Sequence, residues 1–327
     1  MDLRIATPLV RGSLAVDTIL LHRGSFSARI LPHEIERLNV SFGIEETREE
    51  FGGTAGNIAY GCQLLGDSPL INASLGGVDG SAWMGRVASW GLSPSAILMV
   101  DGERGARAYI VTDALGNQIT AFQSGALRHV APLPASGFDF AWLAPDSSLS
   151  MARACAELAA RGVPYVLDPG QSLPSLLEGQ SGADFAAMAA GAEALFVNDY
   201  EAELCASALG IPFENIASSV PICVRTLGAD GCELWEQGAG PTRIPAADPL
   251  RVADPTGCGD AFRSGFIHGK CRGWDAESCA KLGSVMGSFA IEQAGGQNHA
   301  PPLADIRERF KARFGEWPQA RSAGPKP

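Results

Sequence analysis

The chain has 327 residues, 46% of them hydrophobic, and a formal net charge of −11 at pH 7. That length and composition allow a large buried core, organised as one large domain or two. The negative charge argues against a general nucleic-acid binder, because such proteins need a basic surface to displace counterions from the phosphate backbone. Any phosphate-binding site must therefore be local.

Eight cysteines are scattered along the chain, with no C-x-x-C pair and no neighbouring histidine at a spacing typical of zinc sites. This pattern is typical of reduced, mostly buried thiols. The N-terminal stretch 1–17 lacks the apolar core of a signal peptide, and no apolar run approaches the length of a membrane span. We therefore expect a cytoplasmic protein with no membrane partner.

Apolar runs alternate with amphipathic ones along the chain. The pattern predicts strands over 3–16, 70–75, 138–143, 165–167, 194–197 and 222–226, and helices over 55–65, 81–90, 151–161 and 200–209. Further helices are expected after residue 260. This alternation favours an α/β fold with a mainly parallel sheet, helices on both faces and binding sites at the carboxyl ends of the strands.

Two insertions interrupt the alternation. Residues 41–50 are charged, and residues 106–122 resemble a hairpin around a turn at 114–117. We expect them to form a small β-sheet lid, from about residues 17–51 and 104–123, on a single domain spanning 1–320. An ordinary edge hairpin is the alternative that the pattern leaves open. Residues 321–327 are expected to form a flexible tail.

The stretch RVADPTGCGDAFRSGFIHG at 251–269 places two glycines and a carboxylate where a loop becomes a helix. A helix start offers unpaired N–H groups and the positive end of the helix dipole, so it attracts phosphate. The amides of Gly257, Cys258 and Gly259 would stabilise transferred phosphoryl oxygens, and Asp260 would act as the base. A capped helix start with nothing bound is the alternative. A nucleophilic Cys258 thiol is a lesser one.

Three further motifs follow the same logic. FGGTAGNIAYGCQLLG at 51–66 is a glycine-rich loop that leads into a helix, with Asn57 near its start. Asn198 and Glu201 lie one helical turn apart after a buried strand, where they could hold Mg²⁺ through water or simply cap a helix. The turn at 226–231 is small enough to admit a nucleotide, and an ordinary β-turn is its alternative.

Taken in this order, the motifs resemble the PfkB family of carbohydrate and nucleoside kinases. The two family signatures are matched at 52–66 and 254–265, N-x-x-E at Asn198 and Glu201, and T-x-G-x-x-G at Thr226, Gly228 and Gly231. The resemblance covers about residues 10 to 300. It implies a ribokinase-like three-layer α/β/α sandwich with a small β-sheet lid.

Within the family, the chain is most similar to bacterial adenosine kinases, on Ser41-Phe42, DPGQ at 168–171 and Arg263. The resemblance implies that Asp17 and Asn57 hold the ribose hydroxyls and that Gly53 lets the sugar approach the backbone. Ser13, Ser41 and Gln171 would contact the nucleoside, and Arg263 would meet phosphate or substrate. Candidates for stacking on the base, or alternatively for the lid core, are Phe42, Tyr109 and Phe122.

For the transfer, the resemblance implies that Asp260 takes the proton of the nucleoside 5′-hydroxyl as it attacks the γ-phosphorus of ATP. Mg²⁺ would be held through water by Asn198 and Glu201. ATP would lie along Thr226, Gly228 and Gly231 and near Gly295-Gly296-Gln297. Asp254 and Thr256 could line a site for a monovalent cation such as K⁺.

The sequence thus predicts an ATP- and Mg²⁺-dependent kinase that converts adenosine to AMP. Two alternatives stay open: the same chemistry on a sugar or on a broader set of nucleosides, and a non-catalytic nucleoside-binding regulator. The lid could pair with that of a second subunit to give a homodimer, or remain the flap of a monomer.

Overall fold

The computed structural model describes residues 5–30, 39–178 and 181–320. Within them, nine strands form one sheet in the order β13-β12-β11-β10-β9-β8-β1-β4-β5. Their bounds are β1 Pro8–Arg11, β4 Leu70–Gly76, β5 Ile97–Val100, β8 Phe140–Leu143, β9 Tyr165–Leu167, β10 Ala194–Asn198, β11 Ile222–Thr226, β12 Cys232–Glu236 and β13 Ala239–Ile244. Neighbouring strands run parallel from β11 to β5, and β12 and β13 pair antiparallel at one edge.

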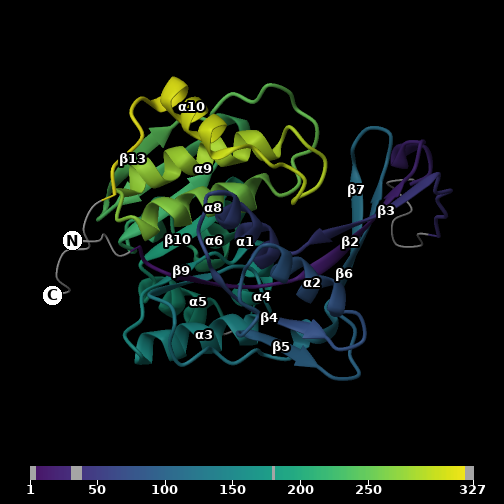
Figure 1. The fold of residues 1–327 in the computed structure, drawn as a ribbon, viewed down its shortest axis with the longest axis horizontal. Coiled ribbons are helices and arrows are strands. Elements are labelled where there is room, and N and C mark those ends of the chain that lie inside the picture. Colours follow the sequence, from purple (N-terminus) through teal and green to yellow (C-terminus); the bar gives the residue numbers. More distant parts are fainter. Residues whose placement is uncertain (1–4, 31–38, 179–180, 321–327) are drawn as a thin grey trace.

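Helices cover both faces of this sheet, which lies between them in Figure 1. Val10 packs on one face with α1 Thr54–Leu64, α8 Cys258–Cys271, α9 Ala276–Ala290 and α10 Leu303–Phe314. Its neighbour Leu9 packs on the other with α3 Ser148–Ala160, α4 Leu173–Leu177, α5 Ser181–Ala190, α6 Asp199–Leu209 and α7 Phe213–Ala217. Because both faces are buried there, the central strands β8, β9 and β10 are apolar at nearly every position, as the sequence predicted.

A second sheet extends from one end of the molecule (Figure 1). Its order is β3-β2-β6-β7, with β2 Ala15–Leu21, β3 Glu46–Gly52, β6 Ala106–Thr112 and β7 Gln118–Gln123. Strand β2 pairs antiparallel with β3 and parallel with β6, and β6 and β7 form the expected hairpin. The mainly parallel sheet, its two helical layers and the smaller sheet are therefore confirmed.

The predicted strand over 3–16 is wrong in one respect. The chain leaves the large sheet after β1 and enters the small sheet as β2, with the break at Gly12. A β-carbon at Gly12 would lie 3.0 Å from Ala144 Cβ and 3.1 Å from Thr54 Oγ1. Because residues on both sides of the break are apolar, periodicity alone could not locate it.

The remaining predicted elements are confirmed with small shifts at their ends, including α2 at Ser81–Ser89. Short 3-10 helices occur at η1 Phe26–Ala28, η3 Gly125–Arg128, η4 Gly170–Ser172 and η5 Gly228–Asp230. Residues 3–4 of the predicted first strand and the predicted tail at 321–327 lie outside the described residues. Across the described ranges, no helix combines the length and apolar character needed to cross a membrane.

Candidate active site

A cavity of about 760 Å³ lies where the small sheet meets the segments that follow β1, β8 and β9. The small sheet contributes residues of β2, β6 and β7, and α8 contributes its first turn. Seven of the residues predicted from the sequence line this cavity: Ser13, Asp17, Gly53, Asn57, Phe122, Gln171 and Asp260. The fold therefore brings together side chains from five separate segments of the chain.

The first turn of α8 begins at Gly257, which has a left-handed backbone conformation (φ +77°). A β-carbon at Gly257 would lie 2.6 Å from the Cα of Gly296, so the two backbones are in close contact. The amide of Cys258 donates to the carbonyl of Pro255 at 3.2 Å. The turn is thus shaped by close packing that only glycine permits.

Asp260 lies in this first turn, partly exposed to the cavity. Its Oδ2 accepts a hydrogen bond from Asn57 Nδ2 at 2.8 Å. Burial raises the pKa of the Asp260 carboxyl to about 6, against the opposing effects of Arg263 and the Asn57 hydrogen bond. Above that pH the carboxylate is ionised, and its pKa is close enough to neutrality for efficient proton abstraction.

Asp17 faces the same cavity from β2. Burial, together with the carboxylate of Glu50 directly across on β3, raises the pKa of Asp17 to about 6. A β-carbon at Gly52 would lie 2.1 Å from Asp17 Oδ2, and one at Gly53 (φ +86°) would lie 2.6 Å from the Ser13 carbonyl oxygen. Gly52 therefore lets β3 close against the Asp17 side chain, and Gly53 lets the following turn close against the backbone of Ser13 and Ala15.

Arg263 is not among the residues that line the cavity. Its guanidinium makes a two-point ion pair with the buried Asp168, and its Nη1 donates to the Gly259 carbonyl at 3.0 Å. Trp142 Nε1 also donates to Asp168 Oδ2, at 3.0 Å. Arg263 thus ties the start of α8 to the segment after β9, and its direct contact with substrate stays a prediction. Ser41 is exposed and is not among the cavity-lining residues.

Asn198 and Glu201 form a reciprocal cap at the start of α6. Asn198 Oδ1 accepts from the Glu201 amide at 2.7 Å, and Glu201 Oε2 accepts from the Asn198 amide at 2.9 Å. Burial raises the pKa of Glu201. Each carboxylate oxygen already accepts one hydrogen bond, so this pair fits a water-mediated Mg²⁺ contact better than direct ligation. Within the described residues, no group of three or more His, Cys, Asp or Glu side chains forms a metal cluster.

The turn predicted to accept the nucleotide follows β11. Thr226 ends the strand, and Gly228 (φ +58°) has no atom within 4 Å of the place where its β-carbon would be. Gly231 (φ +88°) packs closely, since a β-carbon there would lie 2.1 Å from the Ile244 carbonyl oxygen. Gly296 is also close-packed, 2.8 Å from Asn57 Nδ2 by the same measure. Gly228 leaves open space, while Gly231 and Gly296 permit tight packing.

The three aromatic candidates for base stacking have different surroundings. Phe122 lines the cavity and is 53% exposed. Tyr109 follows the cavity-lining Ala108 on β6, so its side chain lies on the opposite face of the small sheet. Phe42 packs against Phe26, with ring centroids 5.0 Å apart. Of these three aromatic residues, Phe122 is therefore the one that lines the cavity.

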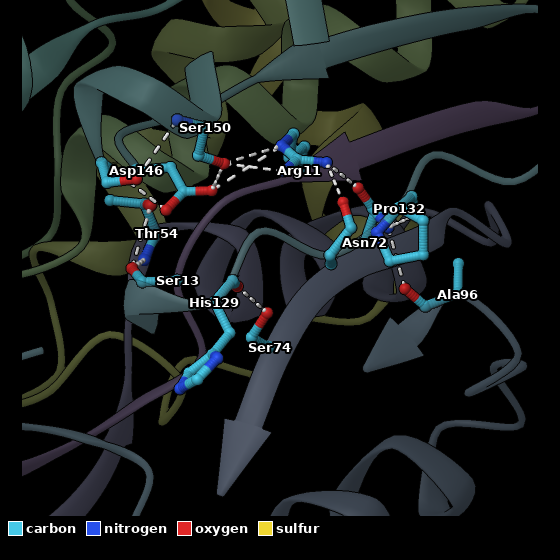
Figure 2. A network of polar contacts seen from close by, with 12 residues as sticks. Arg11, Ser13, Thr54, Asn72, Ser74, Ala96, His129, Pro132, Asp146 and Ser150 are labelled. Atoms are coloured by element: carbon cyan, nitrogen blue, oxygen red, sulfur yellow. Dashed lines mark hydrogen bonds and ion pairs between the residues drawn. The ribbon is translucent and has the colours of Figure 1, made fainter. Parts of the chain in front are cut away.

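The sequence analysis missed a buried arginine beside the cavity (Figure 2). Arg11 of β1 is 2% exposed, and its Nη2 donates to Ser150 Oγ at 2.7 Å. Its Nη1 donates to Asn72 Oδ1 and, at 2.9 Å, to the Ala131 carbonyl. Its Nε lies 3.7 Å from Oδ2 of Asp146, which lines the cavity. An arginine within an apolar strand was the available signal, because a buried charge requires partners.

Cys258 does not have the surroundings of a nucleophile. Burial and the nearby carboxylates of Asp254 and Asp260 raise the pKa of its thiol to about 11. The thiol is therefore protonated at neutral pH, and a protonated thiol is a poor nucleophile. The side chain of Cys258 is therefore not assigned to the chemistry, and its backbone amide donates to the Pro255 carbonyl.

Comparison with known proteins identifies relatives over nearly the whole chain. The pattern of the pfkB family carbohydrate kinases matches residues 30–303. The nucleoside kinase of Methanothermobacter thermautotrophicus is 30% identical over 311 residues, which are 92% of this chain and 98% of that protein.

Solved structures show the same similarity. Burkholderia thailandensis nucleoside kinase in complex with inosine is 38% identical, with a TM-score of 0.87 over 96% of this chain and all of that one. Its complex described as ADP-inosine gives a TM-score of 0.86. Methanocaldococcus jannaschii nucleoside kinase, described as an archaeal member of the ribokinase family, gives 0.82 at 25% identity, over 93% of this chain and 98% of that one. The predicted ribokinase-like fold is confirmed.

Proposed function

The chain belongs to the pfkB family of carbohydrate kinases, and on that premise we propose that it transfers the γ-phosphoryl group of ATP to the 5′-hydroxyl of a nucleoside. The observation that carries this proposal is the cavity that places Asp17, Asn57 and Asp260 together beneath the small sheet. The similar Burkholderia and Methanothermobacter proteins are nucleoside kinases, and the former binds inosine.

The cavity supports a nucleoside in preference to a lone sugar. At about 760 Å³ it is within the range of drug-sized ligand sites and exceeds the needs of a pentose. Asp17 accepts hydrogen bonds from the ribose hydroxyls at one part of the cavity. Phe122 offers a flat apolar surface for the base at another. A sugar kinase would leave this aromatic part of the cavity unused.

Asp260 acts as the base in the proposed reaction. Its carboxylate accepts the proton of the 5′-hydroxyl as that oxygen attacks the γ-phosphorus, and Asn57 holds the carboxylate in place at 2.8 Å. Backbone amides of the Gly257–Gly259 turn would donate to the transferred phosphoryl oxygens, and the Cys258 amide would first have to leave the Pro255 carbonyl. Arg263 keeps that turn in register through its bond to the Gly259 carbonyl.

Mg²⁺ would supply charge neutralisation for the ATP phosphates. Asn198 and Glu201 would hold it through water, which is compatible with their mutual cap. Thr226, Gly228 and Gly231 would line the ATP site together with Gly296, and the open space beside Gly228 supports that placement. Asp254 remains a candidate for a monovalent-cation site. Its pKa is lowered, although burial opposes this, because it accepts hydrogen bonds from Thr256 and Gly295.

Adenosine is the acceptor that we propose first, and a broader nucleoside specificity is the second candidate. The inosine bound to the similar Burkholderia enzyme favours the second. Purified protein should be given ATP and Mg²⁺ with adenosine, inosine, guanosine, cytidine, ribose or fructose, and phosphorylated products measured. Phosphorylation of nucleosides but not of the free sugars is expected. Turnover of ribose or fructose alone would replace this proposal with a sugar kinase, and no turnover of any acceptor would favour a binding regulator.

A homodimer through the small sheet and a cytoplasmic location stay predictions. The face of the small sheet turned away from the cavity exposes Tyr109 and Ile119, at 40% and 42%. Such apolar side chains suit either pairing with a second copy or a monomer's surface. Light scattering of the purified protein distinguishes the two by mass.

A further inference from the structure

A chain of hydrogen bonds runs from Arg86 on α2 to the proposed base. Arg86 Nε donates to Gln297 Oε1 at 3.2 Å, and Gln297 Nε2 donates to Asn57 Oδ1 at 2.9 Å. Asn57 Nδ2 then donates to Asp260 Oδ2 at 2.8 Å. The two central amides are buried, with Gln297 4% and Asn57 6% exposed. Asp260, which faces the cavity, is therefore linked by hydrogen bonds to Arg86, which lies outside the cavity.

These hydrogen bonds all donate in the same direction, from Arg86 toward Asp260, because the two end groups differ chemically. An arginine can only donate hydrogen bonds and an ionised carboxylate can only accept them, whereas a side-chain amide can present either its oxygen or its nitrogen. With Arg86 donating, Gln297 must offer its oxygen to Arg86 and its nitrogen to Asn57. Asn57 must then offer its nitrogen to Asp260. Reversal of either amide would oppose two donors or two acceptors in a buried place.

We propose that Arg86 is a positioning residue for phosphoryl transfer, which fixes both amides so that Asp260 always receives an N–H donor. The inference rests on the proposed role of Asp260 as base. Without Arg86, protonation of Asp260 would let both amides reverse, since the Asn57 oxygen could then accept the carboxyl O–H. Reversal would stabilise the protonated, inactive base. Arg86 prevents this and keeps Asp260 ready to accept a proton.

Arg86 is itself held in place by aromatic rings. Its guanidinium lies 4.8 Å from the ring centroid of Phe51 and 5.4 Å from that of Trp90. Its Nη2 also donates to the Gln297 backbone carbonyl at 3.4 Å. Phe51 belongs to β3 and directly precedes Gly52, which packs against the Asp17 side chain. These contacts limit the freedom of the guanidinium, so its direction of donation is maintained.

Other charged or titratable groups also act on Asp260. Arg263 favours its ionised form, and the carboxylates of Asp168 and Asp17 disfavour it. The Cys258 thiol lies in the same turn and interacts with it. All four groups are unchanged when Arg86 is replaced. A change in the pH dependence of an Arg86 variant therefore reports on the loss of the Arg86 cation at the far end of the hydrogen-bond chain.

The test compares Arg86→Met with Arg86→Lys, using the exposed Arg153→Met of α3 as the matched control. We measure kcat/KM from about pH 5 to about pH 9, where the base titrates. For Arg86→Met, the pH at which kcat/KM falls on the acidic side should rise by about one unit. The value of kcat/KM should then be about tenfold lower than in the wild type at acidic pH and little changed at alkaline pH. Lysine also only donates, so Arg86→Lys should restore the wild-type profile. Arg153→Met should match the wild type.

Each other outcome overturns the inference. A wild-type acid limb in Arg86→Met means that the chain does not need its arginine, and a uniform loss at every pH means a merely structural role. If Arg86→Met does not fold, Arg86→Gln replaces it, because glutamine can reverse and should show the same displaced limb. Asp260→Asn separates the two levels of the argument. Full activity in that variant would refute the assignment of Asp260 as the base. If Asp260→Asn is inactive but Arg86→Met keeps the wild-type pH profile, only the positioning role of Arg86 is refuted.

Discussion

Asp260 carries the proposed chemistry. Its surroundings account for the raised pKa that suits a base and for the stability that the folded protein loses when the carboxyl is ionised. Burial raises the pKa of this carboxyl to about 6, while Asn57 and Arg263 limit the rise. A base with this pKa is mostly ionised at neutral pH yet still accepts a proton readily. The same burial makes the ionised form unfavourable in the folded protein, so function and stability make opposite demands on this residue.

We expect Asp260→Asn to lower kcat by about 10²- to 10⁴-fold, because an amide cannot accept the proton of the attacking hydroxyl. Steady-state kinetics with the preferred nucleoside measure this change. ATP affinity, followed by calorimetry, should stay near the wild-type value since Asp260 is not assigned to the nucleotide site. Comparable turnover in the variant and the wild type would refute the assignment.

Asp260→Asn should also raise the melting temperature at about pH 8, where the wild-type carboxylate is charged. The folded pKa of about 6 lies above the ordinary value of 3.8. The folded state therefore binds the proton more tightly than the unfolded state, and wild-type stability falls as pH rises from about 4 to about 6. The advantage of the variant should disappear at about pH 4, as scanning calorimetry can show. An equal advantage at both pH values would contradict this linkage.

At the scale of single elements, the start of α8 depends on glycine for two reasons. Gly257 has a positive φ of +77°, and a β-carbon there would lie 2.6 Å from the Cα of Gly296. The first reason is conformational and the second is steric. Both shape the turn that precedes Asp260, so the geometry of the proposed anion site is set by the backbone.

Gly257→Ala should therefore lose most of its activity. Its free energy of unfolding should fall by more than about 1–3 kcal/mol, which is the loss expected for backbone strain alone. Gly116→Ala is the matched control, because Gly116 has a similar φ of +83° with no atom within 4 Å of its β-carbon position. Urea unfolding and kcat/KM are measured for both variants. Equal effects of the two substitutions would mean that contact with Gly296 is unimportant.

The elements differ in how readily the sequence predicts them. Helix α1 was predicted well because Gly53 and Gly66 mark its ends. The charged stretch ETREEFG was assigned to the small-sheet lid without strand bounds of its own, and it forms β3, where several of its side chains face solvent. The break at Gly12 was missed because the strands on either side are both apolar. Local patterns indicate an element's surface, but they do not say which sheet it joins.

At the scale of the whole molecule, Arg11 joins parts that are distant in sequence. It bonds Asn72 of β4, Ser150 of α3 and the carbonyl of Ala131, and it lies near Asp146 at the cavity. A buried guanidinium with this many partners holds the segments around the cavity in fixed relation. The shape of the proposed nucleoside site therefore depends on a side chain that does not itself line the cavity.

Arg11→Met should lower the free energy of unfolding by about 3–5 kcal/mol, since it leaves buried acceptors and the Asp146 carboxylate without their cation. Arg153→Met, exposed on the same helix as Ser150, should change it by no more than about 0.5 kcal/mol. Denaturant titration of the two variants gives both values. If Arg11→Met proves as stable as Arg153→Met, the network has no structural importance.

The sequence by itself indicated the alternation of strands and helices, the glycine turns and the family, and through the family resemblance it nominated Asp17, Asn57 and Asp260 as candidate residues. These follow from short-range spacing and from motifs that survive in linear order. The tertiary structure alone decided that Arg263 pairs with Asp168, that Phe122 rather than Phe42 reaches the cavity, and that Arg86 is linked to the base. Such partnerships join residues far apart in the chain, as Asn57 and Asp260 are at a separation of 203 positions. Spacing along a sequence cannot specify them, because burial and hydrogen-bond direction arise only when the layers pack.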